Sequence, residues 1–299
     1  MKLGPNDIAV AADVGGTTIR MGVFDSAYKP GDAIAPLQRQ SSQTLKTNPI
    51  EVLRTAVLSM VPADKRLAAA VIGLPTMFDA STRVVQSSPN IPELEGLDVA
   101  EALSEVLEIP VIVDRETVLM ALGEWVIGVA KGHSAVLGVF IGTGIGGAML
   151  FDGKPYRGAS GAGVEIGHVP IGIEGKQCVC GNIDCLEAYA SGHVLVDVAK
   201  ECGRPIDAIF TEPALAPAID RYVQALSYGL ACAANILDPE ILFIGGGLAL
   251  RDKFPMRRVM DQTRDHLRAP SPRHHMILKP AMLGSQAIIP GARCLLDRL

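Results

Sequence analysis

The sequence predicts an α/β protein, because short apolar strands alternate along the chain with segments of helical periodicity. The β-branched, apolar runs that fit buried strands are Ile8–Val14, Val71–Leu74, Pro110–Val113, Val136–Ile141 and Ile241–Ile244. The segments with a helical pattern are Pro49–Val61, Val99–Leu107, Leu119–Ala130, Cys185–Cys202, Leu215–Leu237 and Phe254–Leu267. The dipeptide Asp152-Gly153 predicts a hairpin turn, so we expect the sheets to be mixed.

Two glycine-rich turns, one near residue 15 and one near residue 144, each follow a predicted strand. This repetition predicts two related α/β lobes, each with a turn that faces phosphate. We expect a small lobe made of residues 1–115 and completed by the C-terminal helix within residues 285–299. Residues 116–284 then form a large lobe that contains the cysteine cluster described below.

The composition fits a globular protein with a sizeable core, since 48% of the 299 residues are hydrophobic and 20% are charged. The formal net charge of -5 argues against a nucleic-acid binder that relies on overall basic charge. One basic segment also carries acidic residues, so we interpret it as a solvated helix face. Its charged residues are Arg257, Arg258, Asp261, Arg264, Asp265, Arg268, Arg273, His274 and His275.

No secretory signal is visible, because the segment Met1–Asp7 carries one Lys and no long apolar run. No apolar run reaches the ~18 residues that a membrane helix needs. We therefore expect a cytoplasmic protein, in which cysteines are kept reduced. In such a compartment, a group of three cysteines within eight residues points to a metal.

The segment Asp13–Arg20 reads Asp-Val-Gly-Gly-Thr-Thr-Ile-Arg and follows a predicted strand. Glycines let the backbone approach a phosphate closely, and N–H groups and threonine hydroxyls can bind its oxygens. An aspartate at the end of the strand, here Asp13, can orient a hydrated Mg²⁺. A plain β-turn accounts for the two glycines, but not for the Asp, the two Thr and the Arg together.

Two later glycine-rich segments also follow predicted strands. Gly142–Gly147 is not a Walker loop, because no Gly-Lys-Ser/Thr follows it. It is not a dinucleotide fingerprint either, because Ala148–Phe151 reads as a strand rather than a helix. The triple glycine Gly245–Gly247 lets a flat ring or a ribose lie against the backbone, although a tight strand-to-helix turn explains it equally well.

The most specific pattern lies between Glu165 and Glu187. Three thiolates and one imidazole there can complete a tetrahedral zinc site, with the ligands His168, Cys178, Cys180 and Cys185. Four protein ligands leave no open position, so the metal is expected to be structural. We interpret the scattered Cys202, Cys232 and Cys294 as small buried hydrophobic residues.

The two phosphate turns and the late triple glycine, in this order, resemble the sugar kinase/actin/Hsp70 ATPase superfamily. The resemblance implies an α/β, two-lobed, actin-like ATPase (ribonuclease H-like) fold, with ATP and a sugar in the cleft between the lobes. It also implies the nucleotide-binding residues. These are Gly15, Gly16, Thr17 and Thr18 for the β- and γ-phosphates, Thr143 and Gly144 for the remaining phosphates, and Gly245 and Gly246 for the adenosine.

The Glu-Ile-Gly-His segment at residues 165–168 and the Cys-x-Cys-x₄-Cys-x-Glu segment that ends at residue 187 are similar to the signature of the ROK family (repressor, open reading frame, kinase). In ROK kinases the matching Glu, His and Glu bind sugar hydroxyls, which implies this role for Glu165, His168 and Glu187. His168 would then also be a zinc ligand. Asn90 lies in Ser-Pro-Asn-Ile-Pro, which resembles a loop with another sugar-binding Asn, although a turn residue beside prolines is nearly as good an interpretation.

ROK kinases usually carry Asn-Asp-x-Asn-x-x-x-x-Gly-Glu, in which the Asp is the general base for the sugar 6-hydroxyl. The matching run here ends in Gly-Glu at residues 123–124, so Glu116 takes the position of the Asp. Arg115 and Val118 stand where the two Asn are expected. A Glu can do the same chemistry, because both carboxylates have similar reference pKa values. Arg115 would favour the ionised carboxylate and retune contacts around the sugar ring.

The resemblance thus implies an ATP-dependent hexose 6-kinase that uses Mg²⁺, holds a structural Zn²⁺ and forms a homodimer. D-allose kinases come closest, because they too have Arg before the carboxylate, whereas glucokinases, fructokinases and N-acetylmannosamine kinases share the zinc motif. Glu116 and Val118 leave a catalytically impaired sugar or nucleotide sensor as the alternative. A ROK repressor is disfavoured, because 12 residues before Asp13 are too few for a DNA-binding domain.

Overall fold

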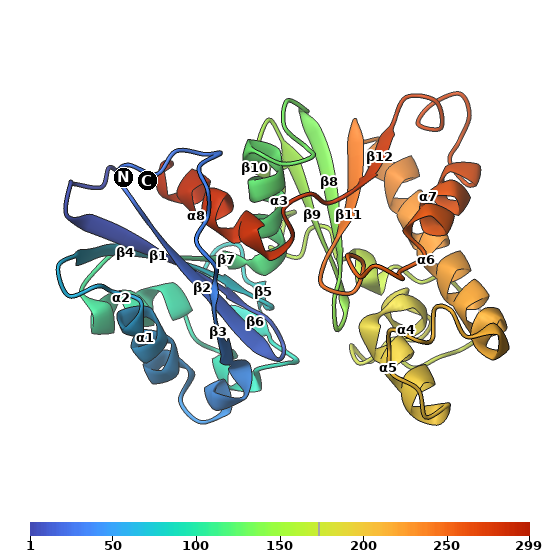
Figure 1. Ribbon diagram of the computed structural model, residues 1–299, viewed down its shortest axis with the longest axis horizontal. Helices are drawn as coiled ribbons and strands as arrows, with labels where there is room; N and C mark the ends of the chain where they lie inside the picture. Colours follow the sequence, from blue (N-terminus) through green and yellow to red (C-terminus); the bar gives the residue numbers. More distant parts are fainter. Residues whose placement is uncertain (173) are drawn as a thin grey trace. The chain divides into compact units, whose positions relative to one another are not determined.

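The structure, a computed structural model, describes residues 1–172 and 174–299. The chain forms two compact units, each with its own five-stranded sheet (Figure 1). Unit 1 comprises Met1–Lys131, Arg157–Gly163 and Ser285–Leu299, and unit 2 comprises Gly132–Tyr156 and Val164–Gly284. The boundary expected at residue 115 therefore lies inside unit 1, and the main chain first passes to unit 2 after Lys131.

The sheet of unit 1 has the strand order β3-β2-β1-β4-β7. β2 pairs antiparallel with β1 and β3, whereas β1, β4 and β7 run parallel to one another. The five strands are β1 (Asp7–Val14), β2 (Thr18–Asp25), β3 (Gln38–Ser41), β4 (Arg66–Leu74) and β7 (Val111–Arg115). A separate two-stranded hairpin contains β5 (Met77–Phe78) and β6 (Val85–Ser87).

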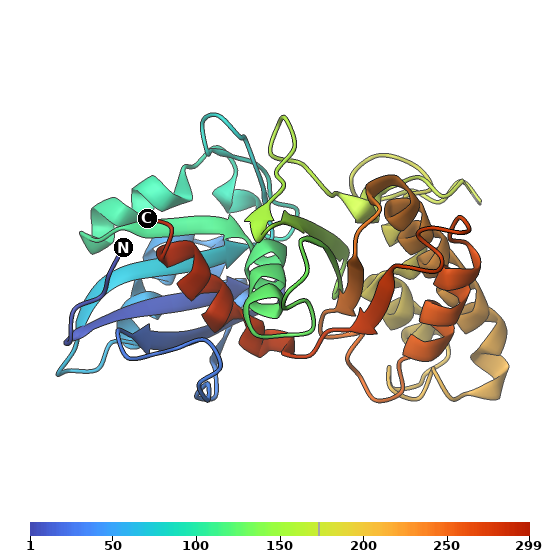
Figure 2. The ribbon, with the colours of Figure 1, turned by 90° about the horizontal axis from the view of Figure 1, so that it is seen from above.

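Four helices cover the two faces of this sheet (Figures 1 and 2). They are α1 (Pro49–Ser59) and α2 (Val99–Leu107) on one face, and α3 (Glu116–Val126) and α8 (Ile288–Leu296) on the other. β1 is buried along its whole length, and its Val10, Ala12 and Val14 share a core with α1 and α2. The short 3₁₀ helices are η1 (Ser42–Lys46), η2 (Pro92–Leu94) and η5 (Gly284–Ala287).

The close packing of α3 on α8 explains why unit 1 extends beyond residue 115. A Cβ atom at Gly123 of α3 would overlap the carbonyl of Ala287, and one at Gly291 of α8 would overlap the carbonyl of Leu119. The two helix backbones are therefore in contact at both glycines. This packing makes α3 part of the core of unit 1, so unit 1 extends past the boundary expected at the first residue of α3.

The sheet of unit 2 has the order β10-β9-β8-β11-β12, with the same pattern of directions as in unit 1. Its strands are β8 (Ala135–Ile141), β9 (Ile145–Phe151), β10 (Lys154–Pro155), β11 (Ile241–Gly245) and β12 (Ile277–Pro280). Asp152 and Gly153 join β9 to β10 with φ values of 49° and 73°, which confirms the predicted hairpin turn.

The helices of unit 2 pack beside this sheet, and their apolar side chains form one core with β8 and β11 (Figure 1). They are α4 (Glu187–Ala190), α5 (Gly192–Glu201), α6 (Ala216–Leu237) and α7 (Met256–Asp265), with 3₁₀ helices η3 (Ile166–His168) and η4 (Pro213–Leu215). The continuous helix predicted over Cys185–Cys202 is broken at Ser191, whose extended backbone (φ −85°, ψ 172°) ends α4 and precedes α5.

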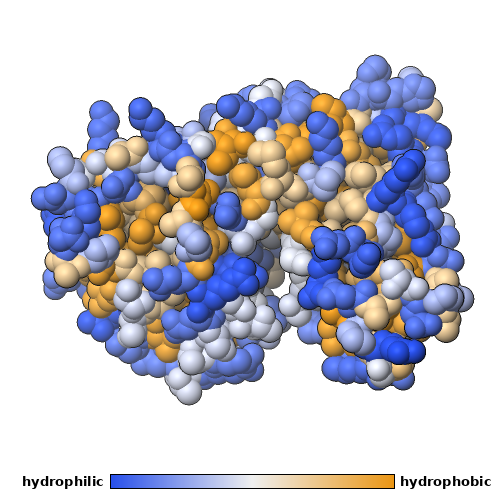
Figure 3. Space-filling view, in the orientation of Figure 1, coloured by the Kyte–Doolittle hydropathy of each residue, from blue (hydrophilic) through white to orange (hydrophobic). Residues whose placement is uncertain are grey.

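Hydrophilic side chains cover much of the face of both units seen in Figure 3, and apolar side chains appear between them in patches. Within residues 1–172 and 174–299, no helix has the length and apolar character needed to span a bilayer. The mixed α/β architecture predicted from the sequence is confirmed by the two mixed sheets and their helices.

Candidate active site

The phosphate turn of unit 1 joins β1 to β2 through Gly15, Gly16 and Thr17. The amide of Gly15 donates a hydrogen bond to the carbonyl of Thr18 at 2.9 Å, which closes the turn. Asp13, at the end of β1, is 4% exposed and forms an ion pair with Arg20 at 2.9 Å. Burial raises the pKa of Asp13, and the guanidinium of Arg20 opposes this rise.

Asn90 lies directly beside this turn. A Cβ atom at Gly16 would be 3.3 Å from Oδ1 of Asn90, so the backbone of the turn and the amide are neighbours. Asn90 itself is exposed and lies just before η2. The structure thus brings together a predicted sugar residue and a predicted phosphate residue that are far apart in the sequence.

Glu116 lies at the carboxyl edge of the same sheet, where Asp13, Gly73 and Asp114 are aligned on β1, β4 and β7. It is the first residue of α3, so its carboxylate is close to a helix N-terminus, which favours negative charge. A Cβ atom at Gly73 would be 2.9 Å from Cα of Glu116. The absence of a side chain at Gly73 therefore lets the start of α3 lie against the end of β4.

Asp114 and Arg115, just before Glu116, bind the segment Arg157–Gly163, which comes from much later in the chain. Asp114 is buried and accepts two hydrogen bonds of 2.6 Å from the guanidinium of Arg157. Arg115 is 7% exposed, and its guanidinium donates to the carbonyl of Gly163 at 2.7 Å. The two ends of the segment Arg157–Gly163 are therefore both fastened at the end of β7.

Arg115 and Val118 take the two positions where the sequence pattern usually has asparagine. The guanidinium of Arg115 binds a backbone carbonyl of unit 1, a contact that was not expected from the sequence. Val118 is 1% exposed and belongs to the core of unit 1 rather than to its surface. The partnership of Asp114 with Arg157 was missed, because no local signal links residues so far apart.

The phosphate turn of unit 2 joins β8 to β9. The amide of Gly142 donates to the carbonyl of Gly144 at 3.0 Å. The first two amides of α5 bind the outside of the turn, since Gly192 donates to the carbonyl of Gly142 at 3.0 Å and His193 to that of Thr143 at 3.1 Å. The N-terminus of α5 thus holds Gly142 and Thr143 through two backbone hydrogen bonds.

Glu187, a predicted sugar residue, contacts this turn. Its Oε2 accepts a hydrogen bond from the amide of Ile145 at 2.7 Å. A Cβ atom at Gly144 would overlap the same carboxylate oxygen. The carboxylate of Glu187 and the phosphate turn are therefore in direct contact, a contact that the sequence did not reveal.

The other predicted sugar residues, Glu165 and His168, lie at the start and end of η3. The residue before them, Val164, has a φ of 68°, in the left-handed region that β-branched residues rarely adopt. A Cβ atom at Gly147 would be 3.0 Å from the Cγ1 of Val164, so Val164 also packs against β9. The strained residue therefore joins the Arg157–Gly163 segment to Glu165.

The four predicted zinc ligands come together. One ligand atom from each of His168, Cys178, Cys180 and Cys185 lies within 4.8 Å of the other three. Sγ of Cys178 is 3.7 Å from Nδ1 of His168, and Sγ of Cys180 is 3.7 Å from Sγ of Cys185. A tetrahedral site with Zn–S bonds of about 2.3 Å has ligands about 3.8 Å apart, so the cluster fits zinc.

The protonation state of two of these thiols would change on metal binding. Burial raises the pKa of Cys178, and it raises that of Cys185 to about 12. Both thiols are therefore neutral at pH 7 unless a cation displaces their protons. A bound zinc ion would deprotonate them and hold the segment between His168 and Cys185 in one conformation.

A second set of contacts ties the cysteine segment to α4. The hydroxyl of Tyr189 donates a short hydrogen bond to the carboxylate of Asp184, and this bond lowers the pKa of Asp184. The same hydroxyl accepts from the amide of Glu174 at 2.9 Å. Nζ of Lys176 lies 4.5 Å from the centre of the Tyr189 ring. Because α4 begins at Glu187, these contacts help to place that carboxylate.

A groove of 650 Å³ lies at the C-terminal end of α5 in unit 2. One wall is the C-terminal half of α5, and the other includes Arg251, in the turns that follow Gly246. Its lining residues are Val196, Ala199, Lys200, Gly203, Arg204, Pro205, Ile206 and Arg251.

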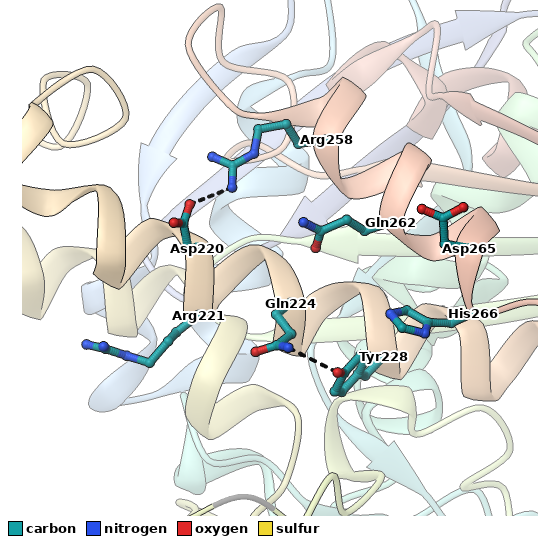
Figure 4. Close-up of a pocket in the computed structure, with 8 residues that line it drawn as sticks. All are labelled: Asp220, Arg221, Gln224, Tyr228, Arg258, Gln262, Asp265 and His266. Carbon is teal, nitrogen blue, oxygen red and sulfur yellow. Dashed lines mark hydrogen bonds and ion pairs between the residues drawn. The ribbon is translucent and has the colours of Figure 1, made fainter.

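The basic segment of the sequence lies mostly on and after α7, and Figure 4 shows the groove of 520 Å³ between α7 and α6. Arg258 pairs with Asp220 of α6 at 2.6 Å, and Gln224 donates to Tyr228 at 3.0 Å. Arg273 pairs with Asp265 at 3.2 Å. These arginines are thus balanced by neighbouring carboxylates, as on a solvated helix face.

Comparison with known proteins places this geometry in a class. A ROK family glucokinase from Streptomyces griseus, in complex with glucose and AMPPNP, matches with a TM-score of 0.82 and 26% identity over 98% of this chain and 100% of that one. A ROK hexokinase from Thermus thermophilus matches with a TM-score of 0.76 and 26% identity, at the same coverage. The two-unit structure is therefore the actin-like ATPase fold of the ROK sugar kinases.

The sequence comparisons agree. The model of the ROK family matches residues 9–298, and the chain belongs to this family. A glucokinase of Thermotoga maritima is 30% identical over 265 residues, which are 80% of this chain and 82% of the relative. An N-acetyl-D-glucosamine kinase of Escherichia fergusonii is 28% identical over 266 residues, which are 79% and 83% of the two chains.

Proposed function

We propose that this chain transfers the γ-phosphoryl group of ATP to the 6-hydroxyl of a hexose, with Glu116 as the general base. ATP-dependent phosphorylation of hexoses is the activity that the related glucokinases and hexokinases support. The observation that carries the residue assignment is the place of Glu116, at the strand edge that also holds Asp13 and the first phosphate turn.

Each unit contributes nucleotide contacts in this proposal. The amides and hydroxyls of Gly15–Thr18 bind the β- and γ-phosphates, and those of Thr143 and Gly144 bind the remaining phosphate oxygens. Adenosine lies against the backbone of Gly245 and Gly246 in this proposal. Mg²⁺, when bound with ATP, neutralises charge on the transferred group, and Asp13 holds its hydration shell.

The chemical step is a direct displacement. Glu116 accepts the proton of the sugar hydroxyl, and the hydroxyl oxygen forms a bond to the γ-phosphorus while the bond from that phosphorus to the bridging oxygen of ADP breaks. ADP leaves with the bonding electron pair, and the proton remains on Glu116 until it passes to solvent. The transition state is loose, so alignment of the hydroxyl matters more than the basicity of the carboxylate.

The sugar is held by two carboxylates, an imidazole and an amide. Glu165, His168 and Glu187 of unit 2 bind ring hydroxyls, and Asn90 of unit 1 adds a further contact. Arg115 supports Glu116 through its position next to it. Glucose and D-allose are the two substrates that we favour, since Arg115 matches the allose kinases and the relatives of this chain include glucokinases.

The remaining parts of the proposal concern zinc, assembly and location. Zn²⁺ bound by His168 and the three clustered cysteines is structural, because four protein ligands complete its tetrahedron. We further propose a homodimer in the cytoplasm, where thiols stay available as metal ligands.

A coupled assay of ADP release tests the proposal. Purified protein should release ADP from ATP only when a hexose is present, and a panel of allose, glucose, fructose, mannose and N-acetylmannosamine should reveal one preferred acceptor. Mass spectrometry of the product should place the phosphate on the 6-oxygen. Binding of ATP and sugar without ADP release would instead identify a catalytically impaired sensor.

A further inference from the structure

We propose that Glu187 couples the binding of sugar to the binding of nucleotide, because one carboxylate contacts both sites. This inference rests on the proposed function only in that Glu187 binds a sugar hydroxyl. It adds a second role that concerns the phosphate turn of unit 2, namely that Glu187 is a positioning residue for the turn Gly142–Ile145.

The contact is specific in geometry. Oε2 of Glu187 accepts the amide of Ile145 at 2.7 Å, at the point where the turn becomes β9. Gly144 packs so closely that any Cβ atom there would overlap Oε2. A hydrogen bond to a carboxylate is stronger than one between neutral groups, so this bond can fix the turn.

The rest of the turn has little freedom to compensate. The carbonyls of Gly142 and Thr143 are held by the first amides of α5, and the amide of Gly142 is held by the carbonyl of Gly144. The rest of the turn, at Gly144 and Ile145, therefore depends on the side chain of Glu187 for its conformation. A carboxylate that rotates away would release the amide of Ile145 and leave Gly144 without its neighbour.

A sugar hydroxyl that binds Glu187 would limit this rotation. The carboxylate has two oxygens, and Oε2 serves the turn, so a hydroxyl on Oε1 leaves the bond to Ile145 intact. The sugar then pays part of the ordering cost of the phosphate turn before the nucleotide arrives. By thermodynamic linkage, the nucleotide must raise sugar affinity by the same factor.

Calorimetric titration of AMPPNP with Mg²⁺, without and with saturating D-glucose or D-allose, measures the coupling directly. In the unmodified protein we expect the sugar to raise nucleotide affinity about tenfold, within the usual range of such couplings. In Glu187→Ala the factor should fall to below about twofold, and nucleotide affinity without sugar should also fall. A Glu187→Gln variant keeps an oxygen that can accept from Ile145, so its nucleotide affinity without sugar should change less than that of Glu187→Ala.

Gly144→Ala provides the sharpest test, because it changes the nucleotide turn and leaves Glu187 in place. The added methyl group would displace the carboxylate, so sugar affinity measured without any nucleotide should fall about tenfold or more, equal to ~1.4 kcal/mol. The matched change in unit 1 is Gly16→Ala, where the added atom would be 3.3 Å from Asn90 and only a small shift is needed. Glu165→Ala should weaken sugar binding but keep the coupling factor at saturating sugar.

The outcomes separate this inference from the proposed function. Unchanged sugar affinity in a folded Gly144→Ala protein, or a coupling factor that survives in Glu187→Ala, would overturn the role of Glu187. Coupled binding that depends on Glu187, in a protein that transfers no phosphate, would support the inference and refute the proposed kinase activity. Circular dichroism melts of every variant identify any that fail to fold, and Glu187→Gln then replaces Glu187→Ala.

Discussion

The two units build sheets with the same strand order and directions, but they secure their phosphate turns by different means. In each unit a predicted sugar residue lies beside a glycine of the turn, Asn90 beside Gly16 and Glu187 beside Gly144. In unit 1 the described contact is van der Waals packing, whereas in unit 2 a carboxylate accepts an amide of the turn. A shared scaffold thus places a predicted sugar residue in packing contact with the turn in one unit and in hydrogen-bonded contact with the turn in the other.

The supports around the two turns differ in the same way. In unit 1 the charged residues are paired within the sheet edge, as in Asp13 with Arg20 and Asp114 with Arg157. In unit 2 the support comes from outside the sheet, through the Cys/His cluster and the hydrogen bonds of Tyr189. We infer that unit 1 is specialised for the chemical step and unit 2 for holding ligands. Changes at four positions, residues 116, 185, 157 and 164, test this comparison.

The largest effect should come from Glu116→Gln in unit 1. Removal of a general base lowers turnover by roughly 10²–10⁴-fold, and the affinities for AMPPNP and sugar should stay near those of the unmodified protein. Steady-state kinetics and calorimetry on the same preparation measure both quantities. Glu105→Gln, an exposed carboxylate on α2, is the control.

Glu116→Asp sharpens this test. If the site is adapted to the longer side chain, the Asp variant should lose turnover, because a displacement of about 1 Å can cost about 100-fold. A rise in turnover would instead show that Glu116 is a decayed position. A Glu116→Gln variant with full turnover would show that another group is the base.

The next effect, in unit 2, is the loss of the metal. Cys185→Ser removes a buried ligand from the cluster, so zinc content should fall well below one per chain and the melting temperature should drop by about 5 °C or more. Sugar affinity should fall with it, because the same segment places His168 and Glu187. Cys232→Ser, an exposed cysteine of α6 outside the cluster, should change neither.

Much of the candidate site could be proposed from the sequence because its signals are local. Glycines after an apolar strand, and cysteines at a fixed spacing with a nearby histidine, indicate a turn and a metal site without any knowledge of the fold. The structure places these ligands together and each turn between two strands. The assignment of Glu116 to the position of the catalytic Asp also came from a local pattern, and it stays a prediction.

The features that were missed depend on long-range packing. No local pattern links Asp114 to Arg157, or Glu187 to Ile145, since each pair meets only after the sheets have formed. The first half of β4 was also missed, because its Leu67–Ala70 segment is rich in alanine, which has low strand propensity. The break between α4 and α5 did have a signal, since Ser191 before Gly192 is a typical start of a helix.

A moderate effect is expected from the pair that fastens the Arg157–Gly163 segment. Arg157→Ala leaves the buried carboxylate of Asp114 without this bidentate partner, and we expect a loss of about 2 kcal/mol in the free energy of unfolding. Turnover should fall more than sugar affinity, because Asp114 lies two residues before Glu116. Chemical denaturation and kinetics test this.

The control for this pair is Arg54→Ala, which breaks the exposed ion pair of Arg54 with Glu51 on α1. Exposed pairs contribute at most about 1 kcal/mol, so this variant should be close to the unmodified protein. Equal stability of the Arg157→Ala and Arg54→Ala proteins would mean that the Arg157–Gly163 segment does not depend on Asp114.

The smallest effect concerns Val164, where the chain passes from that segment to Glu165. Its φ of 68° places a β-branched side chain in a left-handed conformation, which costs about 1–3 kcal/mol. Val164→Gly removes this strain but also loses packing and adds freedom to the unfolded chain, so its net effect on stability is small. Val164→Ala loses similar packing and keeps a Cβ atom at positive φ. The Gly variant should therefore be more stable than the Ala variant by about 1 kcal/mol in urea denaturation, the reverse of their order in ordinary backbone. An Ala variant as stable as the Gly variant would show that Val164 relaxes to an unstrained conformation in solution.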